Sequence, residues 1–235
     1  MALPSPDEKA AVVRAMFDRI APRYDLLNRL FSLRLDQHWR RLTVRAAAVS
    51  ARDTVVDLAC GTGDLSELAA RTGARVVGVD FAANMLAGAR RRGIRAAFVQ
   101  ADAGRLPLPP AWATVVVSGF ALRNFVSIPA VLGEIARVLQ PGGRLALLEV
   151  DTPSNRLLSR GHALYLHRLV PVLGALLSDA RAYAYLPRSV SYLPADAELR
   201  RMVEAAGFRR VTKRRLAGGI AQIVNAIREG AVAGG

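Results

Sequence analysis

The sequence predicts an α/β fold with a doubly wound, mostly parallel sheet of seven strands, and three observations support this prediction. From Thr54 onward, short apolar segments alternate with segments whose apolar residues recur at helical spacing. Such alternation is typical of a parallel sheet with helices on both faces. Gly61 and Gly63 form a tight turn between the first strand and the next helix, and Gly218-Gly219 separates the last two strands as in a hairpin. We therefore expect an antiparallel final hairpin strand.

The individual elements follow from these periodicities. The expected strands are Val55–Ala59, Arg75–Asp80, Ala97–Ala101, Thr114–Gly119, Arg144–Val150, Arg210–Leu216 and Ala221–Ala226. The helices expected between the first five strands are Leu65–Arg71, Asn84–Arg92 and Pro129–Leu139. A further helix is expected to begin with Asp196 as its N-cap and to end at Gly207.

Helices are also expected outside the alternating region. Residues 1–50 show helical periodicity that Pro22 interrupts, which predicts a helical N-terminal cap. Residues 151–195 read as a mostly helical insertion after the fifth strand. Because no internal repeat or low-complexity tract divides the chain, we expect a single domain over residues 1–235.

Composition limits the compartment in which this protein is expected. The longest uncharged stretch, Leu106 to Leu122, contains prolines and is shorter than the roughly 20 apolar residues of a membrane helix. The first ten residues lack the apolar core of a secretion signal. Cys60 is the single cysteine, so no intrachain disulfide can form. A cytoplasmic protein is the expectation.

The net charge of +14 comes almost entirely from arginine. A strongly basic surface suits a polyanion, either nucleic acid or an anionic membrane face. It is equally compatible with a solvated surface in an arginine-rich proteome. Charge alone does not choose among these three readings.

The segment from Asp57 to Asp64 is the strongest chemical signal in the chain. Gly61 and Gly63, with Thr62 between them, lack a Cβ where the backbone must bend and approach a ligand closely. The helix that follows offers free N–H groups to an anionic group. Asp57 can bind the ammonium group of an amino-acid ligand, or accept hydrogen bonds from the loop.

Two further acids follow the next two strands. Asp80 ends the second strand and can accept hydrogen bonds from both ribose hydroxyls of a nucleoside. Asp102 can accept from an adenine amino group, while the N–H of Ala103 faces a ring nitrogen. Together these groups predict S-adenosylmethionine as cofactor, on a Rossmann-like class I methyltransferase fold.

Other classes fit the residues less well. A nicotinamide dehydrogenase would have a third glycine at the position of Ser66 and little use for an acid at Asp57. Amino-methylating nucleic-acid enzymes carry an Asn/Asp-Pro-Pro-aromatic turn, whereas residues 118–121 read Ser-Gly-Phe-Ala. A nucleophilic cysteine for cytosine C5 chemistry would lie beyond the cofactor loop, whereas Cys60 lies inside it. Because both motifs are missing, we do not expect a nucleic-acid substrate. We expect no metal either, because the three histidines show no ligand spacing. A non-catalytic binding protein with this fold remains an alternative.

At the level of longer motifs, the chain resembles the C-methyltransferases of ubiquinone and menaquinone biosynthesis. The resemblance spans roughly Met16 to Ile223. Its most specific motifs are a run containing Tyr24-Asp25, Asn28, Ser32 and Trp39-Arg40, and the Leu122-Arg123-Asn124 turn. Departures include Asp36 in place of a frequent His, and Gly119 at the usual cofactor-contacting Ser position, with Ser118 one residue earlier.

The resemblance implies S-adenosylmethionine-dependent C-methylation of a reduced prenylated quinone precursor, with demethylmenaquinol favoured. A ubiquinone precursor, or another aromatic or lipid substrate, stays open. On this reading Arg123 polarises the quinol oxygen or holds a water, Asn124 orients the ring, and Tyr24 closes over it. Ser118 joins Asp57, Gly61, Thr62, Gly63, Asp80, Asp102 and Ala103 as a cofactor residue.

A polyprenyl substrate lies in the bilayer, so the resemblance also implies contact with the membrane. Leucines and valines between Leu164 and Leu177 lie among several arginines, which suits an interfacial helix or a tail channel. A helix that merely covers the sheet would show the same pattern. We therefore expect a cytoplasmic protein with peripheral contact at the inner face of the membrane, and we keep a homodimer as a candidate assembly.

Overall fold

The computed structural model describes residues 6–153, 155 and 188–230. Most of the expected helical insertion at 151–195, including its apolar and basic residues, lies outside the described residues. Among the helices that are described, none has the length and apolar character needed to cross a bilayer.

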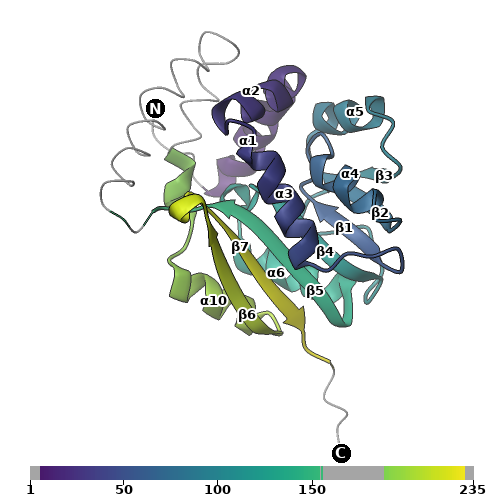
Figure 1. Ribbon diagram of the computed structural model, residues 1–235, viewed down its shortest axis with the longest axis vertical. Helices are drawn as coiled ribbons and strands as arrows, with labels where there is room; N and C mark the ends of the chain where they lie inside the picture. Colours follow the sequence, from purple (N-terminus) through teal and green to yellow (C-terminus); the bar gives the residue numbers. More distant parts are fainter. Residues whose placement is uncertain (1–5, 154, 156–187, 231–235) are drawn as a thin grey trace, which may run out of the picture.

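The strands form one seven-stranded sheet in the order β3-β2-β1-β4-β5-β7-β6 (Figure 1). Their bounds are β1 Thr54–Leu58, β2 Arg75–Asp80, β3 Ala97–Gln100, β4 Ala113–Gly119, β5 Leu139–Val150, β6 Phe208–Leu216 and β7 Ala221–Arg228. The first five strands pair in parallel, whereas β7 runs antiparallel to both β5 and β6. The strand order reverses between β1 and β4, and ligands of such sheets bind in the crevice at this switch point.

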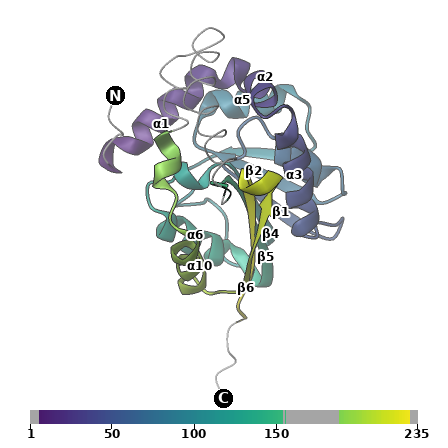
Figure 2. The same cartoon turned by 60° about the vertical axis from the view of Figure 1, so that its left-hand side comes forward.

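Helices cover both faces of the sheet, as the edge-on view in Figure 2 shows for α3 on one side and α6 and α10 on the other. The helices that follow strands are α4 Asp64–Ala70, α5 Ala83–Arg91, α6 Ile128–Val138 and α10 Asp196–Ala205. The N-terminal segment forms α1 Pro6–Ile20, α2 Tyr24–Phe31 and α3 Leu35–Ala46, with the short 3-10 turn η1 Ala21–Arg23 at Pro22. The other 3-10 turns are η2 Leu122–Asn124, η4 Val190–Tyr192 and η5 Ala217–Gly219.

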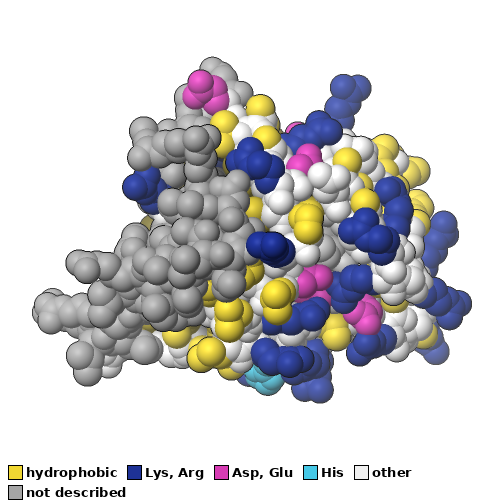
Figure 3. Space-filling model, turned by 90° about the horizontal axis from the view of Figure 1, so that it is seen from above, with side chains coloured by type: hydrophobic (Ala, Val, Ile, Leu, Met, Phe, Trp, Pro, Cys, Tyr) yellow, Lys and Arg dark blue, Asp and Glu magenta, His cyan; other side chains and the backbone are white. Residues whose placement is uncertain are grey.

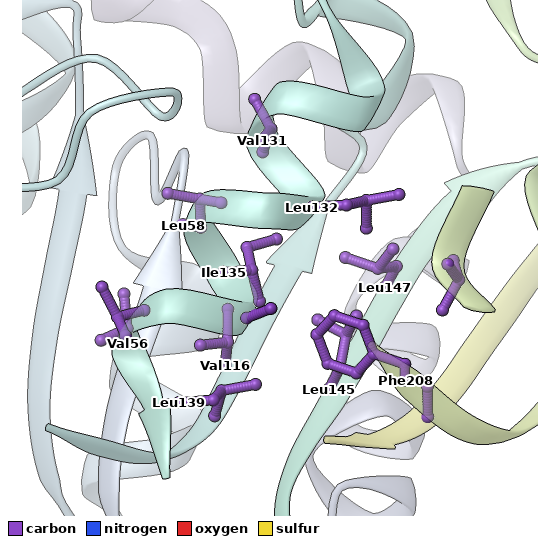
Figure 4. Packing of buried hydrophobic residues seen from close by; sticks show 14 of the residues in the cluster. Val56, Leu58, Val116, Val131, Leu132, Ile135, Leu139, Leu145, Leu147 and Phe208 are labelled. Carbon is purple, nitrogen blue, oxygen red and sulfur yellow. The ribbon is translucent and has the colours of Figure 1, made fainter. Parts of the chain in front are cut away.

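The period-2 alternation of the strands divides the core between the two faces. On one face, Val56, Val116 and Leu145 pack with Leu132 and Ile135 of α6 (Figure 4). On the other face, strand residues pack against residues of α3, its C-cap and α4. The strand residues are Val55, Val76, Val115, Val117 and Ala146, and the helix-side residues are Val44, Ala47, Leu65 and Ala69. Burial on both faces explains why the central strands are continuous apolar runs.

Several element boundaries differ from the expectation. The fifth strand begins at Leu139 instead of Arg144, because Leu139 already pairs with Ala113 before the register shifts. The prediction that Asp196 is an N-cap was wrong. Ala195 is the capping residue of α10, and the Asp196 carboxylate instead pairs with Lys213 and Arg215 of β6.

Candidate active site

A cavity of about 220 Å³ lies at the carboxyl ends of the central strands, next to the switch point. The strands and the loops after them contribute most of its wall, and α1 and α2 contribute the opposite side. The wall contains Ala10, Phe17, Tyr24, Leu58, Ala59, Gly61, Val79, Asp80, Phe81, Met85, Ala101–Gly104, Gly119–Ala121, Asn124–Ser127, Ala130 and Val131. Figure 1 shows the cap helices α1 and α2 above this edge of the sheet.

The glycine turn after β1 leaves room on the cavity side. Gly61 has φ +56°, and a Cβ built on it would meet only the Tyr24 ring, at 3.9 Å. Gly63, at φ +88°, is required for a different reason, because a Cβ there would lie 2.7 Å from the Ile94 side chain. Thus Gly61 keeps the cavity open, whereas Gly63, outside the cavity wall, allows the first turn of α4 to pack closely.

The carboxylate of Asp80 organises the turn. Its Oδ2 accepts 2.8 Å from the N–H of Gly61, and its Oδ1 accepts 2.9 Å from the N–H of Ala82. Burial raises the pKa of this carboxyl, and the two backbone N–H groups oppose that rise. Asp80 faces the cavity with lone pairs to spare, as a ribose-binding acid requires.

The loop after β3 contributes the third part of the wall. Asp102 is exposed, and its Oδ1 accepts 2.7 Å from the N–H of Gly104. Asp102 and Ala103 both line the cavity. The ends of β1, β2 and β3 therefore bring Gly61, Asp80 and Asp102 to one edge, as expected for parallel strands.

Asp57 and Thr62 lie behind the turn, at a second, smaller cavity of about 20 Å³. Asp57 Oδ2 accepts 2.6 Å from the Ser66 hydroxyl, and its Oδ1 is buried without a hydrogen-bond partner. Burial raises the pKa of Asp57 to about 7. The Thr62 hydroxyl donates to Asp25 of α2, which connects the turn to the cap.

The chemistry of these residues suits a ligand that consists of a nucleoside and an amino-acid arm. A buried carboxylate oxygen without a partner at Asp57 suits an ammonium group, and the bare Gly61 suits close approach of a ligand chain. Asp80 and Asp102 supply acceptors farther along the same edge. Within the described parts of the chain, no three His, Cys, Asp or Glu side chains gather as a metal site.

Tyr24 and Asn124 are the polar side chains that face the apolar part of the large cavity. Tyr24 is partly buried, and burial raises the pKa of its hydroxyl, so the hydroxyl stays protonated at neutral pH. Asn124 lies in the turn after β4, where its Nδ2 is 3.4 Å from the Phe120 carbonyl. Aromatic rings surround them: Phe17, Phe81, Phe120 and Phe125.

Arg123 was predicted to act on the quinol oxygen, and the structure places it just outside the cavity wall. Arg123 is buried and absent from the cavity wall. Its Nη1 pairs with Glu149 Oε1 and donates 3.0 Å to the Phe120 carbonyl, while its Nε donates 3.1 Å to the Ser189 hydroxyl. Buried acceptors on β5, near η4 and in the turn after β4 therefore hold the side chain outside the cavity wall.

Ser118, predicted as a cofactor residue, also lies outside the cavity walls. Its hydroxyl donates 2.7 Å to the Leu58 carbonyl of the neighbouring strand, and it lines neither cavity. Gly119 lines both cavities instead. The pairing of β4 with β1 thus places the cavity wall one residue later than expected.

Sequence reasoning overlooked a buried polar cluster between the cap and α4. It consists of Asp36, Gln37, Arg40, Asp64 and Arg92. In the sequence, Arg40 stands out only as part of the Trp39-Arg40 motif. The available signal was its position in α3, where Asp36, Arg40 and Val44 share one helical face.

Comparison with known proteins identifies the family. A model described as the ubiE/COQ5 methyltransferase family matches residues 5–228. The chain belongs to this family. It is 43% identical over 221 residues to the ubiquinone/menaquinone biosynthesis C-methyltransferase UbiE of Syntrophotalea carbinolica, covering 92% of this chain and 93% of that one. It is 46% identical over 200 residues to a demethylmenaquinone methyltransferase of Thermus thermophilus, covering 82% and 91%.

Solved structures of other methyltransferases share the fold at low sequence identity. A SAM-dependent methyltransferase from Aquifex aeolicus aligns with a TM-score of 0.59 at 16% identity, covering 80% of this chain and 88% of that one. Phosphoethanolamine N-methyltransferase 2 of Haemonchus contortus, in complex with S-adenosyl-L-methionine, aligns with a TM-score of 0.59 at 14% identity, covering 80% and 51%. The predicted fold class and the family resemblance are both confirmed.

Proposed function

We propose that this chain transfers the methyl group of S-adenosylmethionine to a ring carbon of a reduced prenylated quinone precursor, converting demethylmenaquinol to menaquinol. The observation that carries the proposal is a single cavity shared by nucleoside-binding acids and an aromatic-lined chamber, in a member of the ubiE/COQ5 methyltransferase family. Relatives named demethylmenaquinone methyltransferase recur among the similar sequences.

On this proposal, the acids at the strand ends bind the cofactor. Asp80 would accept from the ribose hydroxyls, Asp102 from the adenine amino group, and the Ala103 N–H would face the ring. The bound cofactor supplies an electrophilic methyl group, which replaces one ring hydrogen of the quinol as that hydrogen leaves as a proton. The chain's own task is to activate and orient the quinol ring.

A quinol carbon becomes a good nucleophile as the neighbouring hydroxyl loses its proton. The Tyr24 hydroxyl remains protonated and can donate a hydrogen bond to the developing phenolate. Asn124 can hold the other side of the ring, and the apolar wall excludes water. Arg123 acts as a positioning residue, because its bond to the Phe120 carbonyl holds the turn that carries Asn124.

The surface of the cap supports a further part of the proposal, peripheral contact with an anionic membrane. Leu26 and Leu33, in and just after α2, are 68% and 78% exposed. Arg29 lies between these two leucines in the sequence, and Arg34 directly follows Leu33. Seen from the cap side, the surface carries many basic side chains with hydrophobic ones among them (Figure 3). Apolar residues among cations suit an interface with anionic lipid.

The direct test is incubation with labelled S-adenosylmethionine and a panel of demethylated naphthoquinols and benzoquinols, with product mass as the readout. We expect demethylmenaquinol to gain one methyl group. The oxidised quinone should remain unchanged, because its ring carbon is not nucleophilic. Methylation of benzoquinols alone would contradict the menaquinol assignment, and no methylation of any quinol would reject the proposal.

A further inference from the structure

The small cavity behind the glycine turn is the feature that the proposed chemistry does not yet explain. It joins the large cavity, because Tyr24, Ala59, Gly61 and Gly119 line both. Its volume is about 20 Å³, so it can take only the end of a ligand whose main part lies in the large cavity. Its polar lining comes from Tyr24, Arg40, Asp57, Thr62 and Asp64.

Arg40 is a buried cation with an unused donor. Its side chain is 8% exposed, and its Nε has no hydrogen-bond partner. The same Nε lies 3.6 Å from a carboxylate oxygen of Asp36 and 3.6 Å from one of Asp64, which is beyond hydrogen-bond distance. The Nε donor therefore has charged neighbours but no hydrogen-bond partner, which is costly for a buried polar group.

The two nearby acids are already satisfied by other donors. Asp36 accepts from the Ser32 hydroxyl at 2.6 Å and from Gln37 at 3.0 Å. Asp64 accepts from Gln37 at 2.8 Å and from Arg92 at 2.7 Å. These contacts hold both carboxylates in place beside Arg40 without closing on it.

The guanidinium of Arg40 is held close to the joined cavities. Its Cζ lies 5.3 Å from the centre of the Phe120 ring. Its Nη1 would lie 3.2 Å from a Cβ built on Gly119, which lines both cavities. The lack of a side chain at Gly119 therefore leaves the guanidinium accessible from the joined cavity.

Asp57 supplies the complementary group. Its Oδ1 is the second buried polar atom without a partner in the wall of this cavity. A buried guanidinium and a buried carboxylate line one cavity, and they match the two charged groups of an α-amino acid, its carboxylate and its ammonium.

We propose that Arg40 binds the α-carboxylate of the methyl donor's amino-acid arm, with its ammonium group at Asp57. This inference rests on the proposed function, since it assumes that the nucleoside part lies along Asp80 and Asp102. On this proposal, Arg40 binds the amino-acid arm of the methyl donor and does not contact its nucleoside.

Calorimetry with two ligands tests this assignment. S-adenosylhomocysteine carries the amino-acid arm, whereas 5′-methylthioadenosine keeps the nucleoside and thioether but lacks the arm. Arg40→Gln should weaken S-adenosylhomocysteine binding 10- to 100-fold and leave methylthioadenosine binding within about twofold. Arg40→Lys, which keeps the charge but loses the planar fork, should show an intermediate loss. Arg41→Gln, at the exposed neighbouring position of α3, should leave both affinities unchanged.

The outcomes separate this inference from the proposed function. Equal losses for both ligands, or unchanged affinity for S-adenosylhomocysteine, would overturn the role of Arg40 while leaving the cofactor assignment in place. Methylthioadenosine binding by the Arg40→Gln protein also shows that the variant is folded. If the wild-type chain bound neither nucleoside, the proposed function and this inference would both be rejected.

Discussion

The Asp80 carboxylate accepts 2.8 Å from the backbone N–H of Gly61, so the end of β2 holds the turn that follows β1. The same carboxylate faces the large cavity. One side chain therefore shapes the turn and offers acceptors to a ligand.

Replacing this carboxylate should weaken the cofactor site strongly. Asp80→Asn turns one acceptor into a donor opposite a backbone N–H, and we expect S-adenosylhomocysteine affinity to fall about 100-fold, about 2.7 kcal/mol. Calorimetry measures the loss, with the exposed Glu198→Gln as a matched control. Wild-type affinity in Asp80→Asn would remove this residue from the site.

Asp57 should reduce stability at neutral pH. Its pKa is raised from 3.8 to about 7 by burial, so the folded state holds its proton more tightly than the unfolded chain. As the pH rises from about 4 to about 7, the unfolded chain ionises first and wild-type stability falls. Asp57→Asn avoids this loss and should be more stable above pH 7, by up to about 4 kcal/mol.

Urea denaturation at pH 8 and pH 5 checks the sign, because the advantage of Asp57→Asn should shrink at the lower pH. The same variant should bind S-adenosylhomocysteine more weakly. An advantage that does not depend on pH would show that ionisation of Asp57 is not its cause.

Arg123 and Glu149 should be energetically coupled. Both are buried, and removing one leaves the other as an unpaired buried charge, which costs about 3 to 5 kcal/mol. Arg123→Met and Glu149→Gln should each lower the free energy of unfolding by this order, and the double variant should lose less than their sum. Additive losses would argue against the pair, as would a fully stable Arg123→Met.

Replacing Asn124 should lower the turnover number and leave the affinity for the cofactor unchanged. It lines the large cavity in the turn after β4, away from Asp80 and Asp102 in the sequence. Asn124→Ala should lower kcat for the quinol about 10- to 100-fold and leave S-adenosylhomocysteine affinity within twofold. An unchanged kcat would remove Asn124 from the mechanism.

The cap surface should determine membrane binding. Sedimentation with vesicles containing anionic lipid should show binding that weakens as salt increases. Leu26→Ser/Leu33→Ser should reduce that binding, whereas an Arg209→Gln control on β6 should change it little. Binding that is independent of salt, or insensitive to both leucines, would contradict the proposed contact.

Local pattern was sufficient for most of the fold. Apolar runs separated by helical periodicity identify the central strands, because burial on both faces leaves such runs no polar positions. Gly61, Asp80 and Asp102 could be assigned to one site because parallel strands bring their carboxyl ends to one edge. These inferences need only the order of residues along the chain.

Side-chain direction depended on tertiary contacts. Arg123 does not line the cavity and bonds instead to Glu149, 26 residues later, and Ser189, 66 residues later. The Ser118 hydroxyl donates a hydrogen bond to the Leu58 carbonyl of the paired strand β1. Arg40 is buried because α3 packs against the sheet, and only that packing brings it opposite Asp57. The sequence alone determined that Gly61, Asp80 and Asp102 meet at the edge of the sheet. The three-dimensional packing decided which other charged groups face the cavity, because a buried charge turns toward whichever partner the fold places beside it.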